Sequence, residues 1–475
     1  MTATESVTGG VFASVDAAIG NTPLVRLNRI TEGIAATVYV KLEYLNPGGS
    51  VKDRAAVSMI DAAEAAGELR PGSTIVEATS GNTGTGLALV AAARGYPVIA
   101  VVPDKVSAEK IALLRAFGVT VHITPAGRPV GHPEHLRTVA LGLVESIPGA
   151  WFAGQYDNPA NPEAHRTTTG PEIWAQTAGR VTHYVAGIGT GGTVSGAGEF
   201  LKSVGDVTVV GADPDSSVYG GGDGRAWYIE AVGHYVHPET ELDEWPQSYH
   251  LDAVDRIERI PDAEALRVLH RLGREEGLPL GGSSGTAVAA ALRVARELGP
   301  DDVVVVVAPD SGRAYLSKYF NDEWLGRFGF QLLTPADGPT VGDVVAFADT
   351  PTVIESSATV ASAREVLGDL GFAPVRLARE RGGSVVAAEV VGTLRADRLV
   401  GVDCEAPIAD YLDAPLPLVG TTESVVSVLA RVPDGAVLVV HEGIVVGVQD
   451  VSALAVASGD DVAPGDSVNI PGEVQ

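Results

Sequence analysis

The chain has 475 residues, too many for one compact core of ordinary size, so we expect two or three folding units. Its 33 basic residues against 60 acidic ones give a net charge of −27, which repels nucleic-acid phosphates and anionic membranes. The sole cysteine, Cys404, excludes an internal disulfide and a multi-thiolate metal site. No basic or apolar export signal opens the sequence, so we expect a cytoplasmic protein.

Short β-branched runs alternate with longer helical patterns as far as about Phe330. This alternation is typical of βαβ units on a parallel sheet. Five consecutive valines, 303–307, predict a strand that is buried on both faces. We expect an α/β unit with strands over 37–43, 73–80, 97–103, 150–156, 181–189, 207–214 and 301–310, and with helices over 51–67 and 83–95.

A Pro- and Gly-rich stretch, 331–340, breaks this pattern and is expected to be a linker. Beyond it the sequence repeats itself: a helix, a strand, a helix and a hairpin are expected twice, over 341–403 and 404–458, before an acidic tail over 459–475. The alternative is one irregular α+β domain.

Three polar, glycine-rich segments lie between apolar runs and helical patterns, at the sheet edge where open α/β folds bind ligands. Segment 79–84 (TSGNTG) offers hydroxyls and helix-start N–H groups that suit a carboxylate, and 187–193 (GIGTGGT) suits a phosphate. Segment 281–285 (GGSSG) supplies a small hydroxyl. With Lys52 on the glycine-freed turn 46–54 (NPGGSVKDR), these are the parts of a pyridoxal phosphate site for an amino-acid substrate.

Seven motifs lie in the order of a known family: GNTPLVRL, GGSVKDR, TSGNTG, QYDNPANPEAH, GTGGT, GGSSGTA and DSGRAYLSKY. The segment that contains them resembles the fold type II (tryptophan-synthase-type) pyridoxal phosphate enzymes of the cysteine synthase/cystathionine β-synthase group. The resemblance implies an α/β catalytic domain over 1–330, built from two subdomains with parallel or mixed sheets. A tandem α+β regulatory (Bateman) module is implied behind it.

The resemblance also implies a role for each motif residue. Lys52 matches the lysine that forms the Schiff base and moves protons at the substrate α-carbon, which requires an amine of lowered pKa. Asn82 matches the partner of the cofactor's phenolic oxygen, and Ser283 matches the hydroxyl that faces the pyridine nitrogen. The phosphate cup matches Gly189, Thr190, Gly191, Gly192 and Thr193, and the substrate carboxylate site matches Thr79, Ser80, Thr83 and Gln155, with Tyr156 beside them.

Several positions depart from the family pattern. Relatives that bind haem use a cysteine and a histidine in an N-terminal extension, and this chain has no cysteine before Cys404, so no haem is expected. Ala231 replaces a glycine of the loop that shapes the entrance for the second substrate. His234, in the same loop, is either a general base or a surface histidine beside Tyr235 and His237. From its letters alone, Tyr156 would be a core aromatic.

The tandem copies depart as well. Nucleotide-binding copies carry Thr or Ser three residues before an aspartate, but Leu394 stands three before Asp397 and Ser452 stands in the acidic position of the second copy. The module is therefore either a site for an adenosyl nucleotide effector or a dimerisation element. The expected assembly is a homodimer or a homotetramer.

The expected activity is β-replacement through an aminoacrylate intermediate, condensing L-serine with L-homocysteine to give L-cystathionine. The enzyme alternative is cysteine synthesis from O-acetylserine or O-phosphoserine and sulfide, or a related β-substituted alanine synthase. The alternative of another class is a non-catalytic nucleotide sensor. Apart from small amino-acid substrates and the effector, no partner is expected, neither nucleic acid nor membrane, and no metal.

Overall fold

The computed structural model describes residues 11–240, 243, 245–345, 351–379 and 383–457. The acidic tail expected over 459–475 lies outside these residues. The chain divides into two compact units, Met1–Asn321 and Asp322–Gln475, so the division falls before the expected end of the catalytic unit at about 330.

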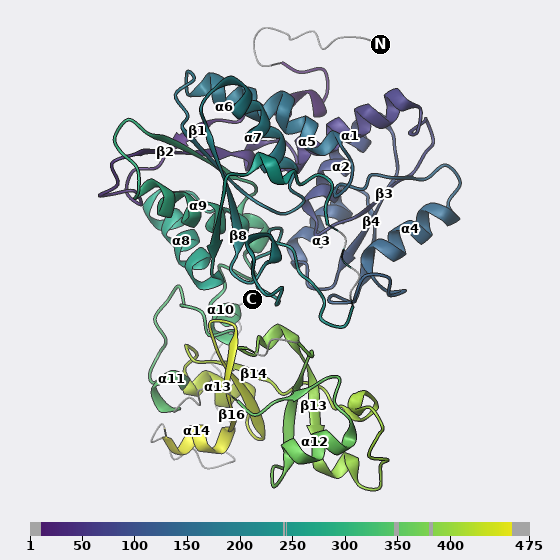
Figure 1. Cartoon of the computed structure of the whole chain (residues 1–475), viewed down its shortest axis with the longest axis vertical. Helices are drawn as coiled ribbons and strands as arrows, with labels where there is room; N and C mark the ends of the chain where they lie inside the picture. The colour runs from purple at the N-terminus through teal and green to yellow at the C-terminus, as the bar shows by residue number, and fades with distance from the viewer. Residues whose placement is uncertain (1–10, 241–242, 244, 346–350, 380–382, 458–475) are drawn as a thin grey trace, which may run out of the picture. The chain divides into compact units, whose positions relative to one another are not determined.

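The first unit contains two sheets (Figure 1). Its six-stranded sheet is parallel except at β1, and its four-stranded sheet is parallel throughout. The six-stranded order is β1 (Leu24–Arg26), β2 (Thr37–Leu42), β10 (Val303–Ala308), β7 (His183–Gly187), β8 (Thr208–Pro214) and β9 (Arg256–Ile260). The four-stranded order is β5 (Thr120–Thr124), β4 (Val98–Pro103), β3 (Ile75–Ala78) and β6 (Trp151–Phe152).

Each sheet is covered by helices on both faces (Figure 1). The larger sheet packs against α6 (Gly170–Gln176) and α7 (Gly192–Val204) on one face and α8 (Asp262–Glu275) and α9 (Gly282–Ala295) on the other. The smaller sheet packs against α1 (Lys52–Ala66), α2 (Asn82–Arg94) and α3 (Ala108–Ala116) on one face and α4 (Leu136–Ser146) on the other. A short α5 (Ala160–Ala164) and a π-turn, η3 (His165–Thr169), precede α6.

The predicted strands are present, and β10 explains why the five valines are uninterrupted. It lies between β2 and β7, and all six of its residues are buried. Three strands are absent from the predicted set: β1, β5 and β9 are edge strands, and most of their residues are exposed or half-buried. The fold class is therefore the expected α/β arrangement.

The second unit contains two three-stranded sheets of the same topology. In each, the first strand is parallel to the second and the third is antiparallel to the second. The first copy comprises β11 (Ile354–Glu355), α12 (Val360–Leu367), β12 (Phe372–Arg376) and β13 (Val390–Arg395), and the second comprises β14 (Leu418–Gly420), α13 (Val425–Arg431), β15 (Ala436–His441), β16 (Ile444–Asp450) and α14 (Val451–Ala457).

The opening segments of the two copies are exchanged. Val341 of α11 (Val341–Val344) is buried in the core of the second copy, and its N–H donates to the Glu423 carbonyl at 2.9 Å. Ile408 of η9 (Ile408–Tyr411) is buried in the core of the first copy, and its N–H donates to Ala358 at 3.2 Å. The boundary expected between 403 and 404 in the sequence therefore does not separate the two cores in space.

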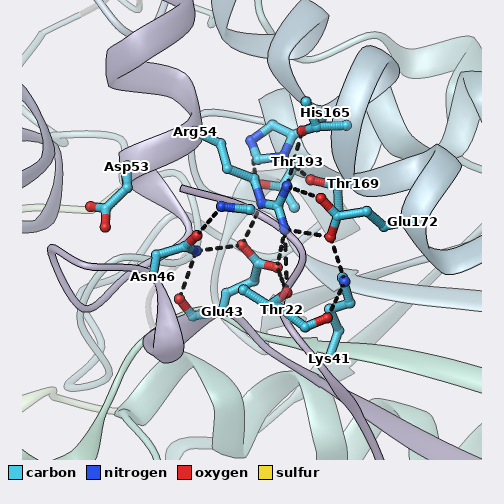
Figure 2. A network of polar contacts seen from close by, with 12 residues as sticks. Thr22, Lys41, Glu43, Asn46, Asp53, Arg54, His165, Thr169, Glu172 and Thr193 are labelled. Atoms are coloured by element: carbon cyan, nitrogen blue, oxygen red, sulfur yellow. Dashed lines mark hydrogen bonds and ion pairs between the residues drawn. The ribbon is translucent and has the colours of Figure 1, made fainter. Parts of the chain in front are cut away.

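Three buried charges and the half-buried Glu172 hold the start of α1 in place (Figure 2). The Arg54 guanidinium donates to both oxygens of Glu43, at 2.7 and 3.0 Å, and to both oxygens of Glu172, at 2.7 and 2.8 Å. Lys41 on β2 donates to Glu172 at 2.7 Å, so two cations face two anions. Charges buried in this way are tolerated because each is paired and hydrogen-bonded.

The same network fixes the turn before α1. The Asn46 amide donates to the Glu43 carboxylate at 2.9 Å and accepts from the Gly20 N–H at 2.8 Å. Gly49 has φ +85°, a left-handed conformation that a side chain would strain. Asp53 closes the turn by accepting from the Gly48 N–H at 2.6 Å. The lysine between Val51 and Asp53 is thus carried on a turn whose geometry is set from both ends.

A chain that ends at Asn321 should fold, because its sheets and cores are complete within the first unit. A chain that ends at 335 retains α10 (Asp322–Arg327), whose packing surface in the second unit, β14, is then missing. We expect cooperative unfolding for both chains by circular dichroism, with the longer one less soluble. A non-cooperative transition for the chain ending at Asn321 would contradict the division into units.

Replacing Glu172 with glutamine should destabilise the protein by about 3 kcal/mol at pH 7, because Lys41 and Arg54 then share one buried anion. Burial alone would raise the pKa of Glu172, but Arg54 and Lys41 lower it to about 2. The stabilisation is therefore fully present above about pH 4.5, the ordinary pKa, and is lost as the pH falls toward 2.

Urea unfolding of both proteins across this pH range tests the prediction, and the two stabilities should converge at the acid end. Glu163→Gln is the matched control, because Glu163 forms an exposed ion pair with Arg166 and the change should have little effect. A Glu172 variant as stable as wild type at pH 7 would contradict the role given to the network.

Candidate active site

Four of the predicted site residues lie at the starts of helices, and two of these helices follow the carboxyl ends of parallel strands. Lys52 begins α1 and Asn82 begins α2, which follows β3. Gly192 begins α7, which follows β7, and Ser283 is the second residue of α9. This is the edge at which open α/β sheets bind ligands.

The Lys52 amine lies beside the glycine-rich loop after β7. Its Nζ is 3.5 Å from the Thr190 hydroxyl. Burial lowers the pKa of Lys52 to about 8, although the nearby carboxylates of Glu77 and Asp310 oppose this shift. A substantial fraction of the amine is therefore neutral, and nucleophilic, just above neutral pH.

The loop Gly187–Thr193 is a close-packed anion cradle. Gly191 has φ +86°, and a Cβ built there would lie 2.3 Å from the Cβ of Tyr249, so only glycine fits. Thr190 accepts from the Asn161 amide at 3.0 Å, and the Gly189 carbonyl accepts from the Tyr219 hydroxyl at 2.8 Å. The helix start behind it presents N–H groups that lack intrahelical partners.

His165 supports this loop from the π-turn (Figure 2). Its Nε2 is 3.2 Å from the Thr193 hydroxyl and its Nδ1 is 2.9 Å from that of Thr169. Burial lowers the pKa of His165 well below its usual value, and the charges of Lys52 and Arg54 act in the same direction, so the ring is neutral. The motif QYDNPANPEAH contains His165 and Asn161, but nothing in their spacing indicates a contact with the loop.

The second predicted loop follows β3. The Thr79 hydroxyl accepts from the Gly81 N–H at 3.0 Å, and the Thr83 hydroxyl donates to Gln155 Oε1 at 2.5 Å. Ser80 is half-buried at the same turn. Tyr156, next to Gln155, is 42% exposed, so the interpretation as a core aromatic is wrong. Thr83 and Gln155 are therefore brought together as expected, whereas Tyr156 lies at the surface.

The sequence interpretation gave no role to two carboxylates of the site, although the motif DSGRAYLSKY begins with Asp310. Glu77 is buried in β3, and burial raises its pKa to about 8 although the Gly154 N–H donates to it at 2.8 Å. Asp310 follows β10 and accepts from the Asn82 amide at 2.7 Å. The position of Glu77 inside the apolar run TIVEA could have indicated a buried carboxylate.

The Ser283 hydroxyl is buried and has no hydrogen-bond partner within the part of the chain that the structure describes. A buried polar atom without a partner costs free energy unless a ligand satisfies it. This hydroxyl, the Gly191 cradle and the amine of Lys52 suit a ligand that carries an anion, a hydrogen-bonding ring and an electrophilic carbonyl.

The loop that contains Ala231 and His234 has a strained backbone, and the His234 side chain is largely withdrawn from solvent. Ala231 has φ +65°, the left-handed region that glycine tolerates better. The His234 side chain is only 13% exposed, and its Nε2 pairs with Asp243 at 2.6 Å. Its ring lies 5.2 Å from that of Tyr219, which holds the Gly189 carbonyl. His234 thus buttresses the anion cradle.

None of the helices in the described residues is long and apolar enough to cross a bilayer. Those residues also contain no cluster of three or more His, Cys, Asp or Glu side chains suited to a metal ion.

Comparisons with known proteins agree with this geometry. The family model "Pyridoxal-phosphate dependent enzyme" matches residues 15–310. A cystathionine beta-synthase of Apis mellifera is 42% identical over 323 residues, covering 67% of this chain and 64% of that protein. A probable cysteine synthase of Bacillus subtilis (strain 168) is 45% identical over 313 residues, covering 65% of this chain and 97% of that protein.

Solved structures give the same result. The O-acetylserine dependent cystathionine beta-synthase from Helicobacter pylori is 37% identical, with a TM-score of 0.58, over 65% of this chain and 98% of that one. The match to the Apis mellifera protein spans less than two thirds of that protein's length. The chain belongs to the pyridoxal-phosphate dependent enzymes, as a fold type II member of the cysteine synthase/cystathionine β-synthase group.

Proposed function

We propose that this protein condenses L-serine with L-homocysteine to give L-cystathionine by β-replacement. The observation that carries the proposal is the Lys52 amine, with its pKa lowered to about 8, at 3.5 Å from the Thr190 hydroxyl of the anion cradle. Cystathionine beta-synthases are among the relatives that match over the catalytic unit. An amine in this state can move protons at neutral to mildly alkaline pH.

The residues present fit pyridoxal phosphate. Asn82 would bind the phenolic oxygen, and the otherwise unpartnered Ser283 hydroxyl would bind the ring nitrogen. The phosphate would be bound by the glycine-rich loop residues Gly189, Thr190, Gly191, Gly192 and Thr193. When bound, pyridoxal phosphate supplies an electron sink for the bonds at the substrate α-carbon.

Each side chain then has a task. Thr79, Ser80, Thr83 and Gln155 would bind the substrate carboxylate, with Tyr156 at the surface beside them. Lys52 Nζ would take the proton from the α-carbon of serine and, once protonated, would deliver it to the departing hydroxyl. Serine can therefore serve as substrate without a separate acid. A neutral hydroxyl at Ser283 would leave the ring nitrogen unprotonated.

Cysteine synthesis is the second candidate. A probable cysteine synthase is 45% identical to this chain and is covered over 97% of its length, and the Helicobacter pylori enzyme is described as O-acetylserine dependent. Ala231 and His234 alter the loop at the proposed entrance for the acceptor. A non-catalytic nucleotide sensor is disfavoured, because Lys52, Asn82 and Ser283 are all retained.

The tandem copies are proposed to regulate the enzyme or to mediate assembly into a homodimer or homotetramer. Leu394 is fully buried, so it presents nothing to a ligand. The Asp397 carboxylate is exposed and lies 3.3 Å from Arg395, and the Ser452 hydroxyl donates to Asp450 at 2.5 Å. Both departures weigh against an adenosyl nucleotide effector and favour assembly.

Borohydride reduction of the protein loaded with pyridoxal phosphate should label Lys52 alone, as read by peptide mass spectrometry. Association of the cofactor with the apoprotein should accelerate with pH around a midpoint near 8, because the neutral amine is the reactive form. Lys52→Ala should abolish the label and turnover without unfolding the protein. Labelling at another lysine would contradict the assignment.

Ser283→Asp should reduce β-replacement severely, because a carboxylate would hold a proton on the ring nitrogen and favour side reactions such as transamination. Rates of cystathionine and keto-acid formation test this, with Ser283→Ala as the control that removes the hydroxyl without adding charge. Wild-type activity in the aspartate variant would remove the argument for an unprotonated nitrogen.

Steady-state kinetics with both substrate pairs decides between the two candidates. We expect serine with homocysteine to give the higher kcat/KM. If O-acetylserine or O-phosphoserine with sulfide is better by more than about tenfold, which is about 1.4 kcal/mol of transition-state stabilisation, cysteine synthesis is the function.

A further inference from the structure

A network of hydrogen-bonded polar side chains connects Asn82 to Glu230, the residue before Ala231. Asp310 accepts from the Asn82 amide at 2.7 Å and from the Tyr315 hydroxyl at 2.6 Å. The Tyr315 oxygen in turn accepts from Lys110 Nζ at 2.8 Å. Lys110 lies on α3, about 200 residues before Asp310 and Tyr315, and none of the site motifs includes it.

At the end of this network farthest from Asn82, one anion lies between two cations. Lys110 Nζ is 3.2 Å from one Glu230 oxygen, and Lys318 Nζ is 2.5 Å from the other. The Lys110 side chain is 3% exposed and that of Glu230 is 8% exposed. Despite burial, the charges of Lys110 and Lys318 lower the pKa of Glu230, so the anion is maintained.

The charges of Asp310 and Lys110 determine the direction of every hydrogen bond from Asn82 to Lys110 in this network. A carboxylate can only accept and an ammonium can only donate. Asn82 must therefore turn its NH₂ group toward Asp310. The Tyr315 hydroxyl must donate a hydrogen bond to Asp310 while it accepts one from Lys110. This fixes which end of the Asn82 amide faces Asp310, and the second amide hydrogen remains for a ligand.

Lys110 also contacts the backbone that precedes Asn82. A Cβ built on Gly81 would lie 2.9 Å from Lys110 Cδ and 3.3 Å from its Cβ, so the stem of the lysine lies directly against this glycine. The lysine therefore constrains Asn82 by two routes, through the backbone at Gly81 and through Tyr315 and Asp310.

We propose that Lys110 is a positioning residue that orients the Asn82 amide toward the phenolic oxygen of pyridoxal phosphate, acting through Tyr315 and Asp310. This inference rests on the proposed function, because the orientation of the amide matters to the reaction only when the cofactor lies beside it. Glu230 and Lys318 keep the ammonium of Lys110 in place.

A double-mutant cycle on the holoenzyme tests this. The variants are Lys110→Met, Asn82→Ala and the pair combined, with Lys110→Arg to restore the cation. Lys202→Met is the matched control, because it removes a cation that is paired with Asp255 and lies outside the network. The readouts are the visible absorption maximum of the bound cofactor and its dissociation constant for the apoprotein.

Lys110→Met and Asn82→Ala should shift the absorption maximum alike and should each weaken binding by about tenfold, and the pair should be no worse than Asn82→Ala alone. Lys110→Arg and Lys202→Met should resemble wild type. If Lys110→Met does not fold, Tyr315→Phe replaces it with the same expectation.

Two results would overturn the inference: multiplicative losses in the double variant, or a Lys110→Met protein whose melting temperature falls while its spectrum is unchanged. Either result leaves the proposed function standing if wild type still shows the borohydride label on Lys52. A wild-type protein that binds no pyridoxal phosphate would overturn both.

Discussion

The Arg54 guanidinium is enclosed by two carboxylates that come from distant parts of the chain, Glu43 after β2 and Glu172 on α6. Because Arg54 lies two residues after Lys52, the same pairing that joins the larger sheet to its helices also sets where α1 begins. The reactive amine thus depends on electrostatic balance remote from the ligand: two cations and two anions, all largely withdrawn from water. Loss of one member leaves an unpaired buried charge, which is far more costly than loss of a surface pair.

Around this fixed turn, the residues that would bind the cofactor are supported by side chains behind them. The residues that would meet the cofactor stand at helix starts, and neutral or partnered groups stand behind them: His165 behind Thr193, Asn161 behind Thr190 and Asp310 behind Asn82. The bond from the Asn82 amide to the Asp310 carboxylate has a fixed direction, so Asp310 orients this amide as well as supporting it.

The sequence was sufficient for the central strands and the helix starts, because a continuous apolar run such as 303–307 and a glycine-rich turn each have a local cause. It failed at the edge strands β1, β5 and β9, where exposed residues dilute the apolar signal. It also failed for the role of Asp310, whose partner Asn82 is 228 residues away, and for His234, whose side chain is only 13% exposed and contacts Asp243. Such contacts are products of the tertiary fold, and local patterns do not contain them.

The exchange of opening segments in the second unit has a consequence for its folding. Val341 completes the core that is otherwise built mainly from β14, α13, β15 and α14. Ile408 completes the core built mainly from β11, α12, β12 and β13. Neither copy therefore possesses a whole hydrophobic core of its own. The pair constitutes one cooperative folding unit despite its internal symmetry, so strain introduced in either sheet is transmitted to the stability of both.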